Sequence, residues 1–308
     1  MASAVISIDA ELAWGFHDHE DPPAHERRRM AAGRSGWGEL VGLLDEFDLP
    51  ATWAVVGRLF LDEAEERITA AYASDGGVPV DPASLPGGSD RWYGSDLVER
   101  VRDADADHEI GCHSFTHLDF TDPETTGAVA RAELRACREV AEDHGIDLES
   151  FVYPRNRIAH RDALAENGFT CYRGREPGRW YDGTPLRAVG KFASYAGGLT
   201  APPVVSPTVD EYGLVNVPAS LHLFGFERHA RRLVRPFTRQ PVVQQAKLGL
   251  ERAVEEDGVF HVWFHPNDLM GPEEIGRVRA VLATIEVMRE RGDITVETMG
   301  EVADRTLA

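Results

Sequence analysis

The chain of 308 residues is poor in cysteine and lysine and contains no long apolar run. Three cysteines without a CxxC pair argue against a disulfide framework or a cysteine-based zinc cluster. No segment approaches the roughly 18 consecutive apolar residues that would span a bilayer. The segment Met1 to Leu12 has neither the basic leader nor the cleavage site of a signal peptide. We therefore expect a cytoplasmic protein with no transmembrane segment and with free thiols.

Only two of the 32 basic residues are lysines, Lys191 and Lys247. The formal net charge of the chain is −20. A surface this acidic repels phosphates, which argues against a nucleic-acid or anionic-membrane partner. Acid excess with few lysines suits a halophilic type of protein that stays hydrated in concentrated salt. A GC-rich genome that favours arginine codons would produce the same composition. The oligomeric state is not readable from the sequence.

Apolar strand-like runs alternate with amphipathic helical stretches along the chain. The predicted strands are Ala4–Ile8, Ala51–Gly57, Glu109–His113, Phe151–Pro154, Phe169–Arg173, Leu214–Leu221, Val259–His265 and Ile294–Val296. The predicted helices are Gly38–Phe47, Ser95–Arg102, Thr125–His144, Asp162–Asn167, Val242–Glu256 and Pro272–Arg291. This alternation predicts an α/β protein with a parallel sheet covered by helices. About seven or eight such units favour a (β/α)7–8 barrel over an open sheet.

We expect a single domain over residues 1–308. Two stretches rich in Gly and Pro, near residues 75–92 and 177–209, interrupt the periodic pattern. We expect both to be loop insertions and not domain linkers, because the alternation resumes after each of them.

The first predicted strand ends in the sequence Ser7-Ile-Asp-Ala-Glu11. Because successive side chains of a strand point to opposite faces, Asp9 and Glu11 share one face. Two adjacent carboxylates repel each other, so they need a cation or a proton on one of them. The pair indicates a candidate site, although two solvated loop acids would give the same pattern in a chain this acidic.

Two histidines follow another strand in the segment His113-Ser-Phe-Thr-His117. Histidines at positions i and i+4 share one face if the chain turns helical after the strand, and this spacing can bring two imidazole nitrogens onto one metal ion. A chain with 12 histidines contains such pairs by chance. The position directly after a buried-looking strand is therefore what favours a metal site.

Two further strands end in polar residues. Arg155, in the stretch Phe151–Asn156, could pair with an acid, bind a polar substrate or lie solvated in a surface turn. His265 ends a very apolar strand and is a candidate proton donor or acceptor, whereas His261, deeper on the same face, is interpreted as a hydrogen-bonded core histidine. Chemistry in barrels lies at the carboxyl ends of the strands. These strand ends together predict one active site.

These motifs resemble those of the polysaccharide deacetylase family, also called the NodB-homology domain or carbohydrate esterase 4 group. His113–His117 is similar to the family's His-Ser-x-x-His metal motif, Ala51–Gly57 is similar to its second strand, and His265 stands where its late catalytic histidine is expected. The resemblance covers most of the chain. It implies a distorted barrel of the NodB-homology type, one divalent metal ion held by one acid and two histidines, and no organic cofactor.

The chain departs from the family pattern in its first motif. The family usually has two adjacent aspartates, the first a base and the second a metal ligand, but here Ala10 separates Asp9 from Glu11. The spacing resembles family variants whose acids stand one residue apart. By this resemblance Asp9 is the base, and Glu11 is the metal ligand together with His113 and His117. The reverse assignment of the two acids stays open.

A second departure concerns an arginine. The stretch Phe151–Asn156 lies where the family's arginine motif is expected, and Val152 occupies the place of the usual arginine. We expect Arg155 to replace that charge from a different backbone position, with a nearby backbone amide stabilising the oxyanion.

The expected reaction is hydrolysis of an N-acetyl group on a sugar or polysaccharide precursor, a carbon–nitrogen bond other than a peptide bond. Asp9 would take the proton of the attacking water and His265 would protonate the leaving amine. Zinc is the expected metal from mixed histidine and carboxylate ligands, although these ligands also suit other ions. A cytoplasmic location would favour a lipid-linked or nucleotide-linked precursor.

Two alternatives stay open. The chain could hydrolyse another small linear or cyclic amide on the same fold. It could also be a degenerate metal- or glycan-binding module without turnover, because the acid spacing and the arginine both depart from the family pattern.

Overall fold

The structure is a computed structural model that describes residues 1–19, 21–62, 72–74, 76–78, 80–81, 88–198, 200–225 and 240–308. The strands are β1 Ser3–Ala10, β2 Thr52–Val55, β3 Glu109–Cys112, β4 Ser150–Phe151, β5 Cys171–Gly174, β6 Thr208–Val209, β7 Val215–Pro218, β8 Leu221–His222, β9 Val259–Phe264 and β10 Thr295–Glu297. The α-helices are α1 Ala24–Glu46, α3 Ser95–Arg102, α4 Gly127–Asp143, α5 Arg161–Glu166, α6 Arg187–Gly197, α8 Pro241–Glu256, α9 Pro272–Glu290 and α10 Met299–Leu307. Short 3-10 helices are η1 Trp14–Phe16, η2 Gly57–Phe60, η4 Ser89–Arg91, η5 Pro154–Asn156 and η6 Pro266–Asp268.

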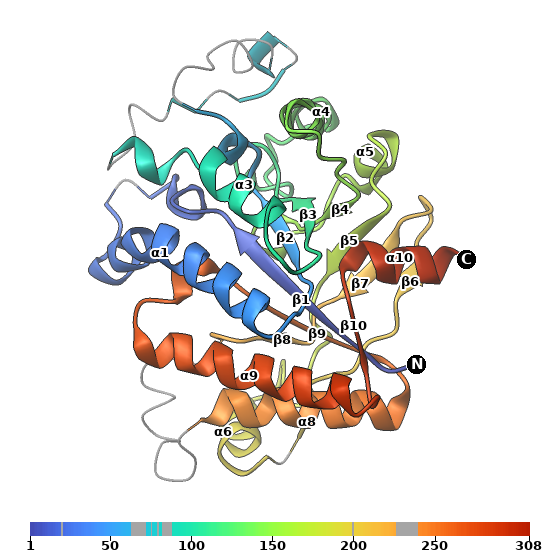
Figure 1. The fold of residues 1–308 in the computed structure, drawn as a ribbon. Coiled ribbons are helices and arrows are strands. Elements are labelled where there is room, and N and C mark those ends of the chain that lie inside the picture. The colour runs from blue at the N-terminus through green and yellow to red at the C-terminus, as the bar shows by residue number, and fades with distance from the viewer. Residues whose placement is uncertain are drawn as a thin grey trace.

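The strands form one curled sheet in the order β6-β7-β5-β4-β3-β2-β1-β9-β8, with β10 paired to one end of β1. All pairings are parallel except that of β6 with β7. Only Ala219 and Ser220 separate β7, which pairs with β5, from β8, which pairs with β9. One short chain segment therefore passes between the two sides of the curled sheet, and the helices lie around its outside (Figure 1). The predicted distorted barrel is confirmed.

The strand β1 lies at the centre of this sheet, and all eight of its residues are buried. It pairs with β9 along Ser3–Ile8 on one side, and with β10 and β2 in turn on the other. A parallel strand buried on both faces has no solvent side, which explains its continuous apolar character. Since the neighbouring strands run parallel to β1, their carboxyl ends meet at one rim, where the polar residues of the sequence motifs come together.

Several boundaries differ from the sequence predictions. Helix α3 has the predicted bounds, but α1 begins at Ala24 and not at Gly38. The first part of α1 lacks an apolar stripe because it packs through glycine. At Gly36 the helix backbone lies so close to η6 that a Cβ would be 2.0 Å from the carbonyl oxygen of Pro266. Helix α10 was not predicted, although Thr298 and Glu301 form a capping box that signals its start.

The stretch 177–209 is not wholly irregular, which corrects the predicted loop. It contains helix α6. Within this helix, the hydroxyl of Ser194 donates to the carbonyl oxygen of Gly190, and the carbonyl oxygen of Ser194 accepts a hydrogen bond from the side chain of Gln245 on α8. The stretch 75–92 falls partly outside the described residues, and its described part contains η4. Among the described residues, no helix is long and apolar enough to cross a membrane.

A polar layer lies in the barrel interior below the rim. His261 is fully buried on β9, and its Nε2 lies 2.8 Å from the hydroxyl of Ser7 on β1, which confirms the interpretation as a hydrogen-bonded core histidine. Ser7 also accepts a hydrogen bond of 3.0 Å from Arg173 on β5. Burial, together with the charge of Arg173, lowers the pKa of His261 to about 3. The imidazole is therefore neutral in the folded protein at neutral pH.

We expect the folded state to lose stability as the pH falls from 6.5 toward 3, because unfolding frees His261 to bind a proton that the folded chain rejects. The loss from this residue is about 2 kcal/mol at pH 5. Urea unfolding at pH 7 and pH 5 measures it. The His261→Gln variant should lose less stability than the wild-type chain between these pH values, and an equal loss in both would contradict the assignment.

Candidate active site

The two predicted carboxylates lie at the end of β1 and have different partners. Asp9 is the penultimate residue of the strand and Glu11 follows it, and both are buried. A Cβ at Gly15 would lie 2.1 Å from Glu11 Oε1, so a residue without a side chain is needed there to leave room for the carboxylate. Because each carboxylate has its own partners, the electrostatic repulsion between the two neighbouring acids is compensated.

Asp9 is held by Arg173, which projects from β5 and is fully buried. Arg173 Nη1 donates to Asp9 Oδ1 at 2.5 Å and Nη2 donates to Oδ2 at 2.7 Å, a two-point contact that fits the planar guanidinium. Burial alone would raise the pKa of Asp9, but the charge of Arg173 more than offsets it, and the pKa is lowered. Asp9 is therefore a carboxylate at neutral pH.

Glu11 lies beside the two motif histidines. Its Oε2 is 3.1 Å from His117 Nε2 and 3.7 Å from His113 Nε2. One ligand atom from each of the three residues lies within 4.8 Å of the others, and all three residues are buried. One carboxylate and two imidazoles in this arrangement form a donor set suited to a divalent transition metal.

An unpaired polar atom of the site fits a bound metal ion. His113 Nδ1 lies 2.7 Å from the carbonyl oxygen of Val152, which fixes the proton on Nδ1 and leaves the lone pair of Nε2 facing Glu11. Within the described part of the chain, this buried Nε2 has no hydrogen-bond partner. A buried imidazole lone pair aimed at a carboxylate fits a metal ion between them.

The loop from His113 to His117 is not the predicted helical turn. Its residues follow β3 in irregular conformation, and Ser114 and His117 both have a φ of 59°. Left-handed backbone at residues other than glycine costs energy and persists where the surroundings hold it. The backbone reversals, and not helical periodicity, bring the two rings to a centroid distance of 5.1 Å.

A buried carboxylate on α4 holds this loop. Glu133 Oε2 accepts hydrogen bonds from the backbone N–H groups of Phe115 at 2.8 Å and Thr116 at 3.0 Å, and Oε1 accepts from the Thr116 hydroxyl at 2.8 Å. The hydroxyl of Tyr72 donates to the same carboxylate. Glu133 thus fixes the residues between the two histidines. Glu133 was not predicted from the sequence, although an acid on the apolar face of a helix is an unusual residue in a core.

His265 follows β9 and faces both acids. Its Nε2 lies 3.8 Å from Asp9 Oδ2 and 3.9 Å from Glu11 Oε1, while its Nδ1 lies 3.0 Å from Asp268 Oδ2. Burial lowers the pKa of His265, but the charges of Glu11 and Asp268 outweigh it, and the pKa is raised. Asp268 therefore orients the ring with Nε2 toward the carboxylates.

A second group of ligand-type atoms joins His222 to His265 and Asp268. Arg29 lies 2.9 Å from Asp268 Oδ1 and supplies a positive charge there. This group is part of the support of His265, since an arginine already balances its carboxylate.

The predicted role of Arg155 beside the base is wrong. Arg155 lies on η5 and pairs with Asp18 at 2.6 Å, and its side chain is one-third exposed. Arg173 provides the charge on Asp9 instead, because β5 lies across the barrel interior from β1 and points its residue inward. The signal in the sequence was an arginine within an otherwise apolar strand, where a charge persists only if it is paired.

One family model matches part of this chain. The family model described as polysaccharide deacetylase matches residues 30–171, which include His113, His117 and Glu133. No curated protein matches the chain.

Solved structures share the fold at low identity. A presumed polysaccharide deacetylase from Mycobacterium smegmatis is 16% identical over 99% of this chain and 90% of its own, with a TM-score of 0.59. The PuuE allantoinase is 13% identical over 98% of this chain and 88% of its own, with a TM-score of 0.55. Residues 30–171 therefore match the polysaccharide deacetylase family model, and the chain as a whole shares the fold of solved structures such as that from Mycobacterium smegmatis.

Proposed function

We propose that this chain removes N-acetyl groups from a sugar or polysaccharide precursor by metal-dependent hydrolysis. One observation carries the proposal. The two carboxylates at the end of β1 have different partners, because Asp9 pairs with Arg173 and Glu11 lies beside His113 and His117. His265 faces both at 3.8–3.9 Å. A ligand set, a base and a proton donor therefore surround one point.

Glu11, His113 and His117 would hold the metal ion. Zinc is the metal proposed, because two imidazoles and one carboxylate are common zinc ligands and leave a position open. A bound divalent ion polarises a carbonyl group and makes water more acidic. The contact between His113 Nδ1 and the carbonyl oxygen of Val152 keeps the His113 ring oriented toward the proposed metal position. The hydrogen bonds of Glu133 to the loop fix the backbone that carries the two histidines.

Asp9 is proposed as the base. Both its oxygens are bonded to Arg173, which keeps it ionised and fixes its plane next to the ligand set. Its basicity is reduced by that pairing, so it accepts a proton only from a strongly acidified water molecule. Asn156 and Trp263 hold Arg173 in turn, through a hydrogen bond of 3.0 Å and through a ring whose centroid lies 4.3 Å from the guanidinium carbon.

His265 is proposed as the group that protonates the leaving nitrogen. Asp268 binds its Nδ1, so the proton to be delivered stands on Nε2, which faces the carboxylates. The nitrogen of the scissile amide would therefore lie on the side of the substrate that faces His265. A backbone amide near Arg155 stays the predicted donor to the oxyanion.

An assay of the purified protein with two substrate classes tests the proposal. We expect acetate release from N-acetylglucosamine and its oligomers. Turnover of small cyclic amides such as allantoin without acetate release would assign the chain to the other hydrolase class. Bound metal without turnover of either class would assign it to the binding modules.

Two substitutions at the end of β1 separate base from ligand. We expect Asp9→Asn to keep the bound metal and to lower hydrolysis at least about 100-fold, because it removes the proton acceptor. We expect Glu11→Gln to lose metal as well as activity. Metal content and acetate release measure both. Asp21→Asn, at a side chain that is 95% exposed, is the matched control. Metal loss in the Asp9 variant and retention in the Glu11 variant would reverse the assignment.

Glu133 should govern metal affinity without touching the metal. We expect Glu133→Gln to weaken metal binding by about 10–100-fold, because an amide cannot accept all the hydrogen bonds that order the His113–His117 loop. Competition against a chromophoric chelator measures the affinity. Glu139→Gln, an exposed position on the same helix, should leave it unchanged. Equal affinities in the two variants would refute the link.

A further inference from the structure

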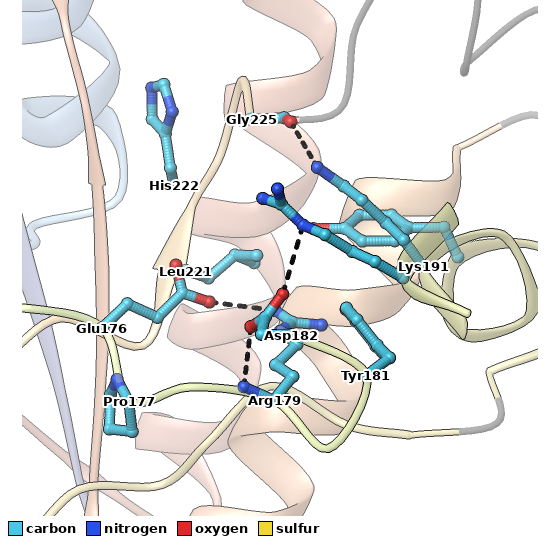
Figure 2. Close-up of a pocket in the computed structure, with 11 residues that line it drawn as sticks. Glu176, Pro177, Arg179, Tyr181, Asp182, Lys191, Leu221, His222 and Gly225 are labelled. Carbon is cyan, nitrogen blue, oxygen red and sulfur yellow. Dashed lines mark hydrogen bonds and ion pairs between the residues drawn. The ribbon is translucent and has the colours of Figure 1, made fainter. Parts of the chain in front are cut away.

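His222 ends strand β8 and stands beside Trp263 in the parallel register of β8 with β9. Its imidazole stacks on the indole of Trp263, with the ring centroids 4.0 Å apart and the planes at 15°. Figure 2 shows the imidazole directed away from the carboxylates of Glu176 and Asp182, although all three residues line one pocket. The ring of His222 therefore packs against β9 and not against these charges.

The other face of the Trp263 indole carries a cation. The guanidinium carbon of Arg173 lies 4.3 Å from the centre of the same ring, a distance at which the two groups attract each other. Two planar groups this close to one ring centre cannot share a face, so Arg173 and His222 lie on opposite faces. The strand register agrees, because Trp263 pairs with Ser7 of β1 on one side and with His222 on the other. Arg173 donates to Ser7, on the first of these sides.

The edge of the His222 ring lies near the carboxylate that orients His265. His222 Nε2 is 3.8 Å from Asp268 Oδ2, and the same oxygen lies 3.0 Å from His265 Nδ1. The Nε2 atom of His222 is buried and has no hydrogen-bond partner within the part of the chain that the structure describes. Catalytic hydrogen bonds are often long without substrate and shorten in the working complex. Asp268 is therefore the partner within reach of this unpaired nitrogen.

These contacts close a ring of six side chains around the site, in which each lies against the next: His222, Trp263, Arg173, Asp9, His265 and Asp268. The ring contains the proposed base, Asp9, and the proposed proton donor, His265. His222 is the member opposite these two, and it lies against the support of each. Its removal would open the ring on the side away from the reaction.

We propose that His222 is a positioning residue, which fixes the proton donor and the base of the active site relative to each other. It acts on His265 through the carboxylate of Asp268. It acts on Asp9 through the stack of Trp263 on Arg173. The inference rests on the proposed function for the roles of His265 and Asp9, and on the geometry alone for the contacts of His222.

Steady-state kinetics of His222 variants test the proposal. We expect His222→Ala to lower kcat by about 10–100-fold and to leave KM within about threefold, because a small misplacement of catalytic groups slows the chemical step. Metal content should stay at the wild-type level, since His222 is not in the group of Glu11, His113 and His117. His25→Ala, at an exposed histidine of α1, is the matched control and should change neither quantity. A wild-type kcat in His222→Ala would overturn the inference.

A second variant separates positioning from packing. His222→Phe keeps an aromatic ring on Trp263 but removes the nitrogen beside Asp268, so we expect a wild-type Tm with kcat still lowered by about tenfold. In a double-mutant cycle, His222→Phe should cost less than about threefold in the Asp268→Ala background, because its target is already absent. A wild-type kcat in His222→Phe, or two factors that multiply in the double variant, would show that His222 does not act through Asp268.

Crystal structures of the wild-type chain and of His222→Ala give a readout that needs no turnover. We expect the His265 ring of the variant to leave the 3.0 Å contact between its Nδ1 and Asp268. Unchanged positions of His265 and Arg173 would overturn the inference, whether or not the chain hydrolyses an amide. Displaced side chains in the variant of a chain that hydrolyses no amide would refute the proposed function and leave the contacts of His222 as inferred.

Discussion

The buried pair of Arg173 and Asp9 is the interaction on which the site depends. It crosses the barrel interior from β5 to β1, and the same guanidinium also bonds Ser7 and Asn156 and lies over Trp263. A buried charge without its partner is very costly, commonly 3–5 kcal/mol when one member of such a pair is removed. The two-point geometry therefore fixes the distance between opposite strands and the ionisation of the acid at once.

This pair also explains how two carboxylates two residues apart can be buried together. The charge of Asp9 is compensated by the permanent cation of Arg173. Glu11 does not share this partner and lies beside His117 instead. The same principle recurs elsewhere at the rim. Glu133 is satisfied by backbone amides of the loop it orders, and Asp268 is balanced by Arg29 while it orients His265. Each buried acid of the site has a partner on another element, so the site is held together by the fold.

The sequence by itself determined the alternation of strands and helices, and with it the barrel and the rim to which Asp9, Glu11, His113 and His265 belong. These follow from local patterns, since side-chain periodicity and strand ends are properties of neighbouring residues. Only the tertiary structure decided which arginine meets Asp9, because Arg173 and Arg155 differ in the direction that their elements give them and not in composition. It also decided that a loop with two left-handed residues, and not a helix, joins the histidines. Contacts between residues far apart in the chain depend on how the sheet curls, and no local pattern encodes that.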